Sequence, residues 1–265
     1  MEEAEFQAIL DHENRHWWYR GRLRIVRQEV ERLGLPDGAR ILDAGCGSGR
    51  VLDELARFGD VVGVDLSSTA VAAAWARGHS VAKARVEELP FPDSSFDLVT
   101  CLDVIEHTPD DLRALRELVR VTRPGGHLLV TVPAYQSLWS AHDVRNEHYR
   151  RYRRRVLRDV AGRAGWQLVR DTHFNSLLLP AAATMRLAER LRRERADHGS
   201  DLSLTPPRLN SLLELPLRLE AVLLAHGVTL AAGLSVAALF VRPRLPAPPR
   251  PVGLAVRRPP VAHAA

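Results

Sequence analysis

Cysteine is scarce in this chain, and so are the features of an exported protein. Of the 265 residues only Cys46 and Cys101 are cysteines, and both stand inside apolar segments, so no disulfide framework is expected. Residues 1–10 carry three glutamates and no charged-then-apolar leader, so we expect no signal peptide. These absences favour the reducing cytoplasm as the location of the protein.

Lysine is scarcer still, because Lys83 is the only lysine among 37 basic residues. The formal net charge is +5, and five arginines without any acid follow residue 241, so residues 1–240 are formally neutral. A neutral body lacks the basic surface that nucleic acid requires. The composition therefore argues against nucleic acid as a partner.

Long hydrophobic runs are also few. Residues 221–241 contain no Asp, Glu, Lys or Arg, and their length would suffice to span a bilayer. However, the run is rich in alanine and includes His226, Gly227 and Gly233, and its last part is needed as a strand. We therefore expect no membrane span.

From residue 40 onward, short apolar segments alternate with segments of helical periodicity. We predict strands at residues 41–44, 61–65, 80–84, 96–102, 127–132, 166–172 and 234–241. Helices are predicted at residues 50–58, 67–77, 110–121 and 154–164. This alternation predicts a doubly wound α/β fold, with a mostly parallel sheet covered on both faces and a ligand crevice at the carboxyl ends of the strands.

The segments outside this core have different compositions. Residues 1–38 read as helical, and residues 39–174 form the predicted core. Residues 175–232 read as a helical insertion broken by Pro180, by residues 206–207 and by Pro216. The remaining segments are a last strand at residues 233–242 and a proline- and arginine-rich tail at residues 243–265, predicted to be disordered.

A glycine-rich turn follows the first predicted strand. Gly45, Gly47 and Gly49 alternate directly before a predicted helix, so the backbone can turn sharply and approach a ligand closely. The spacing is G-x-G-x-G after Asp43, not the G-x-G-x-x-G of dinucleotide-binding turns. Asp65 ends the second strand, where a carboxylate can bind both hydroxyls of a ribose.

These segments carry a family resemblance. Residues 41–49 and 62–67 resemble the first two motifs of class I S-adenosylmethionine-dependent methyltransferases. Residues 88–97 and 123–126 resemble the later motifs of the small-molecule branch of that superfamily. The resemblance implies a seven-stranded Rossmann-like sheet, S-adenosyl-L-methionine as the cofactor, and an N-terminal helical lid at residues 1–38.

The resemblance also implies residue roles around the turn. Gly45 and Gly47 would pass beneath the methionine portion of the cofactor, Asp43 would orient the loop or the amino group, and Asp65 would hold the ribose. The other expected cofactor contacts are Cys46, Leu66, Val86, Glu87, Leu102 and Asp103, with Arg22 on the methionine carboxylate.

Candidate catalytic residues follow the fourth and fifth strands. Residues 133–152 resemble a subgroup with a Trp-Ser-x-His-Asp…His-x-Arg-Arg-Tyr pattern, in which His148 or His142 would act as a base and Asp143 would orient the imidazole. His107, in a Glu-His pair after the fourth strand, is a further candidate. The alternative, that these histidines brace the loops, stays open, and we expect no metal ion.

The expected activity is methylation, by preference O-methylation, of a small molecule or a lipid- or glycan-linked acceptor.

Several other segments allow two interpretations. The arginines of residues 145–158 suit an anionic acceptor; alternatively, they only form the solvent-exposed start of a helix. Trp17 and Trp18 would cover the ligand or simply pin their helix. The insertion, with arginines at residues 186–195, would allow peripheral contact with a membrane. The rival functions are a non-catalytic cofactor-binding partner subunit and a nucleic-acid or protein methyltransferase.

Overall fold

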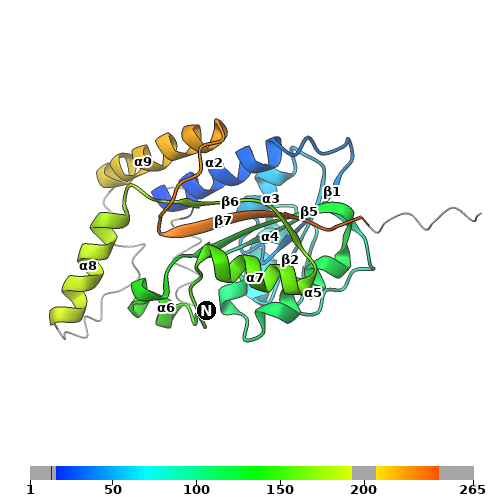
Figure 1. The fold of residues 1–265 in the computed structure, drawn as a ribbon. Helices are drawn as coiled ribbons and strands as arrows, with labels where there is room; N and C mark the ends of the chain where they lie inside the picture. The colour runs from blue at the N-terminus through cyan, green and yellow to red at the C-terminus, as the bar shows by residue number, and fades with distance from the viewer. Residues whose placement is uncertain (1–12, 14–15, 193–206, 245–265) are drawn as a thin grey trace, which may run out of the picture.

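The computed structural model describes residue 13, residues 16–192 and residues 207–244 (Figure 1). Three of the predicted segments lie wholly or partly outside these residues. Most of the predicted helical segment before residue 16, the arginines at residues 193–195, and the predicted disordered tail from residue 245 onward lie outside the described residues.

Seven strands form one sheet in the order β3-β2-β1-β4-β5-β7-β6. The strands are β1 (Arg40–Ala44), β2 (Asp60–Asp65), β3 (Val81–Lys83), β4 (Phe96–Leu102), β5 (Thr122–Pro133), β6 (Gln167–Phe174) and β7 (Ser235–Val241). Among the described strands, β7 alone runs antiparallel to its neighbours, β5 and β6. The predicted mostly parallel seven-stranded sheet is therefore confirmed. The strand order reverses between β1 and β4, which opens a crevice at their carboxyl ends.

Helices cover both faces of this sheet. The helices of the described residues are α2 (Trp17–Glu31), α3 (Arg50–Leu55), α4 (Ser68–Ala76), α5 (Asp111–Val121), α6 (Ala141–Arg145), α7 (Arg154–Ala164), α8 (Leu179–Arg192) and α9 (Pro207–Ala225). Of these, α6 and α8 lie away from the faces of the sheet (Figure 1). Because side chains alternate along a strand, Ile41 and Leu98 pack against α2 and α3, whereas Leu42 and Val99 pack against α5 and α7. Figure 1 shows α2 and α9 side by side on one face of the sheet, with α5 and α7 on the other.

The contact of α2 with α9 depends on a glycine. A Cβ atom on Gly21 would lie 2.4 Å from Cδ1 of Leu217, so a larger residue would push the two helices apart. Arg20 and Arg24 of α2 pair with Glu214, a buried carboxylate of α9. The insertion therefore holds α2 in place over the carboxyl end of the sheet.

The predicted break at Pro216 is wrong, because α9 runs through that residue. A proline removes one backbone hydrogen bond of a helix, but tertiary packing can outweigh that loss. After the proline, Leu217 and Ala221 are buried in one core cluster with Ile25 of α2. Before it, the buried carboxylate of Glu214 pairs with two arginines of α2, so contacts with α2 hold both halves of α9 in one helix. No helix among the described residues has the length and apolar character needed to cross a membrane.

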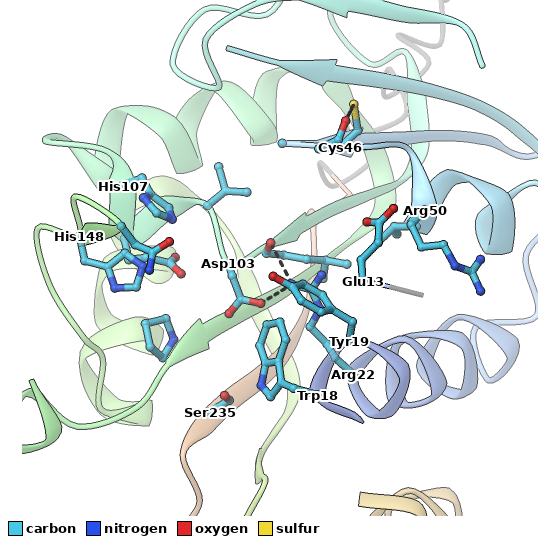
Figure 2. Close-up of a pocket in the computed structure, with 18 of the residues that line it drawn as sticks. Glu13, Trp18, Tyr19, Arg22, Cys46, Arg50, Asp103, His107, His148 and Ser235 are labelled. Atoms are coloured by element: carbon cyan, nitrogen blue, oxygen red, sulfur yellow. Dashed lines mark hydrogen bonds and ion pairs between the residues drawn. The ribbon is translucent and has the colours of Figure 1, made fainter. Parts of the chain in front are cut away.

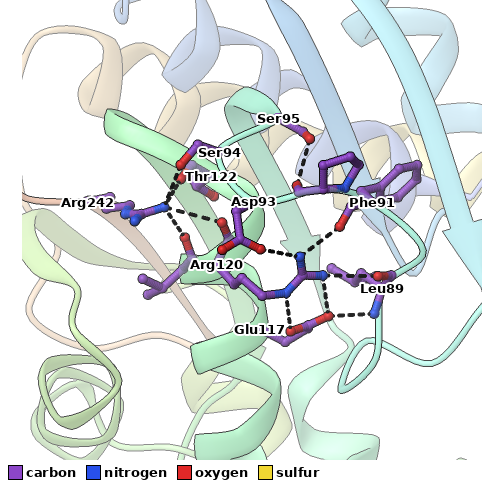
Figure 3. A network of polar contacts seen from close by, with 11 residues as sticks. Leu89, Phe91, Asp93, Ser94, Ser95, Glu117, Arg120, Thr122 and Arg242 are labelled. Atoms are coloured by element: carbon purple, nitrogen blue, oxygen red, sulfur yellow. Dashed lines mark hydrogen bonds and ion pairs between the residues drawn. The ribbon is translucent and has the colours of Figure 1, made fainter.

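Two side chains of α5 bind the motif predicted at residues 88–97 (Figure 3). Glu117 accepts a hydrogen bond from the N–H of Leu89 at 2.7 Å. Arg120 donates hydrogen bonds to the carbonyl oxygens of Leu89 and Phe91, at 3.0 and 2.7 Å. The same guanidinium pairs with Asp93 at 2.8 Å. The described part of this motif thus stabilises the fold.

The fifth strand begins earlier than its predicted start at residue 127. Thr122 already pairs with Phe96 of β4, and the N–H of Gly125 donates to the carbonyl oxygen of Arg242 at 2.7 Å. The side chain of Arg242 also donates to the Thr122 carbonyl oxygen (Figure 3). Contacts from the end of β7 therefore extend β5 through residues 122–126, which contain one proline and two glycines and so do not read as a strand in the sequence.

Candidate functional site

A cavity of about 1080 Å³ lies at the carboxyl ends of β1, β2 and β4 (Figure 2). Its walls come from the glycine turn, from α2, from the segments after β4 and β5, and from α8. All eleven predicted cofactor contacts line it: Arg22, Asp43, Gly45, Cys46, Gly47, Asp65, Leu66, Val86, Glu87, Leu102 and Asp103. The structure therefore brings together residues that the sequence distributes over 82 positions.

The glycine turn requires residues without side chains at two points. Gly45 has φ +85°, and a Cβ there would lie 2.3 Å from Val104. Gly47 has φ +52° and faces open space, so a side chain there would occupy the cavity itself. Asp65 accepts hydrogen bonds from the N–H groups of Gly47 and Ser67, both at 2.9 Å. One carboxylate thus fixes both the turn and the beginning of α4.

Asp43 is buried, and among the described residues only one of its two carboxyl oxygens has a hydrogen-bond partner. Its Oδ1 accepts a hydrogen bond from the Thr100 hydroxyl at 2.6 Å, whereas Oδ2 has no hydrogen-bond partner within the described part of the chain. Burial raises the pKa of Asp43 from 3.8 to about 7, although the Thr100 hydrogen bond opposes this shift. This end of the cavity therefore offers an acceptor to a hydrogen-bond donor or a cation.

Arg22 and Asp103 form an ion pair at the centre of the cavity (Figure 2). The Arg22 guanidinium lies 4.6 Å from the centre of the Trp18 ring, and Asp103 also accepts a hydrogen bond from Thr131 at 3.0 Å. Trp17, in contrast, packs against the core cluster that joins α2 to α9. Trp18 is therefore the tryptophan whose ring stacks on a charged group of the site, while Trp17 helps to pin the helix.

A second group of polar side chains surrounds His148. Nδ1 of His148 lies 2.8 Å from Oδ1 of Asp143, which is fully buried and does not itself line the cavity. Arg151 binds both oxygens of Asp143, at 2.7 and 2.9 Å, and the Ser140 N–H donates to Oδ2 at 2.8 Å. Burial alone would raise the pKa of Asp143, but the hydrogen bonds from His148 and Arg151 outweigh it and hold that pKa below its usual range. The predicted orientation of an imidazole by Asp143 matches this geometry.

His107 and Glu106 complete this group. The His107 ring lies 4.6 Å from the His148 ring, nearly perpendicular to it, and burial lowers the pKa of His107 to about 4. Glu106 is completely buried, and neither of its carboxyl oxygens has a hydrogen-bond partner among the described residues. Burial raises the pKa of this carboxyl well above its usual range. Sequence reasoning passed over Glu106, although it stands in the predicted Glu-His pair.

The far end of the cavity is mostly apolar. Leu178, just before α8, and Ala181, Ala182 and Met185 of α8 line it, as does Leu213 of α9. Arg186 of α8 also lines the cavity. Two small polar residues also reach the cavity, Asn175 at the end of β6 and Ser235 at the start of β7. The sequence suggests that the insertion at residues 175–232 borders an acceptor pocket, but it does not single out these residues, because no local signal shows that the end of β6 and the starts of β7 and α8 meet at one place.

Comparison with known proteins finds a methyltransferase domain in the part of the chain that carries the glycine turn. Residues 42–130 match the sequence profile of a methyltransferase domain. These residues therefore belong to a methyltransferase domain. The match covers the glycine turn, Asp65, the Glu106–His107 pair and most of β5, so the cavity is built on this domain.

Curated relatives of the methyltransferase domain include enzymes named for O-methylation. A ubiquinone biosynthesis O-methyltransferase of Alkalilimnicola ehrlichii is 40% identical over 107 residues, which cover 37% of this chain and 42% of that protein. A 27-O-demethylrifamycin SV methyltransferase of Amycolatopsis mediterranei is 38% identical over 118 residues, covering 40% and 42%. The chain therefore spans less than half the length of these two relatives.

Solved structures share the fold of the chain outside the domain as well. A putative methyltransferase of Haloferax volcanii, solved with its Trm112 activator, superposes with a TM-score of 0.59 at 19% identity and covers 91% of this chain and 95% of that one. A phosphoethanolamine N-methyltransferase of Haemonchus contortus has a TM-score of 0.54 at 23% identity, covering 82% and 52%. These likenesses show the methyltransferase fold.

The arginines of residues 145–158 lie mostly away from the methyltransferase cavity. Of these arginines, only Arg151 lines the cavity, and its guanidinium is bound to Asp143. Arg150 pairs with Asp111, and Arg154 and Arg158 pair with Asp171. The described contacts of these four side chains therefore hold elements together.

The Asp43→Asn variant tests the raised pKa of Asp43. Ionisation of this buried carboxyl lowers the free energy of unfolding as the pH rises, and asparagine cannot ionise. Because the pKa of Asp43 is raised from 3.8 to about 7 on folding, its protonated form favours folding, and that stability is lost as the pH rises through this window. We expect the free energy of unfolding of Asp43→Asn, relative to the wild type, to rise between pH 4 and pH 7 by up to about 1.4 kcal/mol per pH unit, and the difference in Tm to grow with it. Thermal melts of the ligand-free protein measure this difference. The exposed Asp37→Asn variant serves as the control, and a pH-independent difference for Asp43→Asn would contradict the assignment.

Proposed function

We propose that this protein is an S-adenosylmethionine-dependent methyltransferase that methylates a hydroxyl group of a small molecule. The observation that carries the proposal is the continuity of one cavity, which runs from the glycine turn, past Asp103, to the side chains around His148. Such a space can hold a methyl donor and an acceptor end to end, as in-line transfer requires.

The turn and the strand ends fit the cofactor. Gly47 leaves room where a Cβ would intrude, and the unpartnered Oδ2 of Asp43 is an acceptor for the amino group. Asp65 already binds two N–H groups, but each carboxylate oxygen keeps a further acceptor site for a ribose hydroxyl. Arg22 would bind the methionine carboxylate in exchange for Asp103, with Leu66, Val86, Glu87, Cys46 and Leu102 around the remainder.

The bound cofactor supplies an electrophilic methyl group, and the residues around His148 would prepare the acceptor. Asp143 holds Nδ1 of His148, which leaves Nε2 to approach the acceptor hydroxyl and assist the loss of its proton. Asp143 acts as a positioning residue, because it does not line the cavity. Alignment of the two reactants in a cavity of this kind contributes roughly 7–11 kcal/mol.

We also propose that the acceptor is linked to a lipid or a glycan, and that the protein contacts the membrane surface. Ala181, Ala182 and Met185 of α8 line the same cavity and suit a hydrocarbon chain. On α9, Leu212, Leu215, Leu219 and Val222 recur at helical spacing and are each more than half exposed. An apolar stripe beside a lipid-sized cavity suits a membrane surface.

Cofactor binding tests the first part of the proposal. We expect Asp65→Asn to weaken the binding of S-adenosylmethionine by roughly 10- to 100-fold, because hydrogen bonds to a charged acceptor are lost. Gly47→Val should weaken it further, because its side chain enters the cavity. Isothermal titration calorimetry measures both Kd values, with Asp60→Asn, an exposed change at the start of the same strand, as the control. Wild-type affinity in both variants would overturn this assignment.

Turnover tests the acceptor end. We expect His148→Ala to lower kcat by roughly 10²- to 10⁴-fold while the Kd of S-adenosylmethionine stays unchanged, because the imidazole meets the acceptor and not the cofactor. Formation of S-adenosylhomocysteine with a panel of catechols and alkyl glycosides measures the rate. His226→Ala, an exposed change on the C-terminal side of α9, is the matched control. Full turnover in His148→Ala would remove this residue from the reaction.

Vesicle binding tests the membrane contact. We expect the protein to sediment with vesicles of phosphatidylcholine and phosphatidylglycerol, and Leu215→Glu with Leu219→Glu to abolish this, because charge opposes burial of the stripe. Trp75→Glu, at a residue that is 73% exposed on α4, is the control. Equal sedimentation of all three proteins, or none with the wild type, would reject a lipid surface as the partner of α9.

A further inference from the structure

We propose that Glu106, His107 and His148 bind a divalent transition-metal ion inside the cavity. Each residue offers one ligand atom, and these three atoms all lie within 4.8 Å of one another. Metal–nitrogen and metal–oxygen bonds of about 2.0–2.2 Å would draw them slightly closer. The three ligand atoms therefore already lie close to the distances from one another that a bound metal ion requires. The consequence for catalysis, but not the binding itself, rests on the proposed function.

The strongest support is the carboxyl group of Glu106. It is completely buried, and both oxygens are without a hydrogen-bond partner among the described residues. Leaving buried polar atoms unpaired costs several kcal/mol, roughly 1–3 for each group and more if charged. The nearby cations cannot relieve this, because Arg22 is bound to Asp103 and Arg151 is bound to Asp143. A cation between Glu106 and the histidines would satisfy the carboxylate.

The surroundings of His148 are those of a metal-bound imidazole. A ligating histidine commonly donates its second ring N–H to a carboxylate, which fixes the ring and raises its basicity. Nδ1 of His148 makes this contact with Asp143 at 2.8 Å, which leaves Nε2 for a metal ion. Asp143 is held in turn by Arg151 and Ser140. The ring of His148 is thus oriented before any ion binds.

The backbone holds the ligands at a fixed distance. Glu106 and His107 are neighbours in the short 3-10 helix at Ile105–His107, whereas His148 lies on the loop after α6. The N–H of Tyr149 donates to the carbonyl oxygen of Glu106 at 2.7 Å and joins the two segments. Two imidazoles and one carboxylate favour zinc, cobalt or iron over magnesium, which prefers oxygen ligands.

A metal ion at this place would have a direct chemical use. With three protein ligands, coordination positions stay open toward the cavity, where the acceptor oxygen can bind. The metal ion lowers the pKa of the bound hydroxyl, and the O–H proton passes to water. The oxygen then forms a bond to the methyl carbon while the carbon–sulfur bond breaks and its electron pair stays on sulfur. With the ion bound, Nε2 of His148 would hold the metal ion, and His148 would assist proton loss through that ion instead of contacting the acceptor hydroxyl itself.

Metal binding by the full-length, chelator-treated protein tests the inference. We expect one equivalent of Zn²⁺ or Co²⁺ to bind by titration calorimetry, Co²⁺ to give the visible absorption of a nitrogen-containing site, and Mg²⁺ to bind far more weakly. Glu106→Gln and His148→Asn should each weaken Co²⁺ binding by about 10-fold or more. His142→Asn is the matched control, because His142 also lines the cavity, 6.2 Å from the His148 ring, but is outside the ligand group.

The outcomes separate this inference from the proposed function. Absence of stoichiometric Zn²⁺ and Co²⁺ binding in wild-type protein that still binds S-adenosylmethionine would overturn the metal site alone. Binding that survives both Glu106→Gln and His148→Asn would place the ion elsewhere and equally overturn it. If one of these variants unfolds, as circular dichroism would show, the other variant and the Co²⁺ spectrum decide. Metal binding without cofactor binding would instead reject the proposed function.

Discussion

The parallel pairing of β1 with both β2 and β4 is the constraint on which the site depends. Because these three strands run in the same direction, their carboxyl ends meet at one edge of the sheet. Asp43, Asp65 and Asp103 stand at or just after those ends, although they are distant in sequence. Reversal of any one of the strands would carry its aspartate to the opposite edge and dismantle the cavity.

The helices outside the matched domain complete what the sheet begins. α2 brings Trp18 and Arg22 over the strand ends, and it is held there by its close contact with α9 at Gly21 and Leu217. The position of α2 therefore depends on a segment almost 200 residues later. Variation in the insertion would thus alter the part of the cavity beside α2 and α8 without disturbing the glycine turn.

Burial of acidic groups gives the cavity its chemical character. Asp43 and Glu106 are both nearly or fully buried, and each has at least one oxygen without a partner among the described residues. Desolvation disfavours their charged forms unless a cation is close. Asp43 borders the glycine turn and Glu106 lies beside His148, so the site suits one positively charged ligand at the turn and a second cation beside His148.

Sequence by itself predicted the strands and the glycine turn, because apolar periodicity and glycine spacing are local properties that the neighbouring residues fix. Through the family resemblance it also named eleven residues that line one cavity. It also placed His148 and Asp143 in one short segment. Only the tertiary structure decided that Glu106 is buried without a partner beside two imidazoles and that α9 runs through Pro216. Those features arise from packing between segments far apart in the chain. The local sequence pattern does not predict which residues a distant segment will bury.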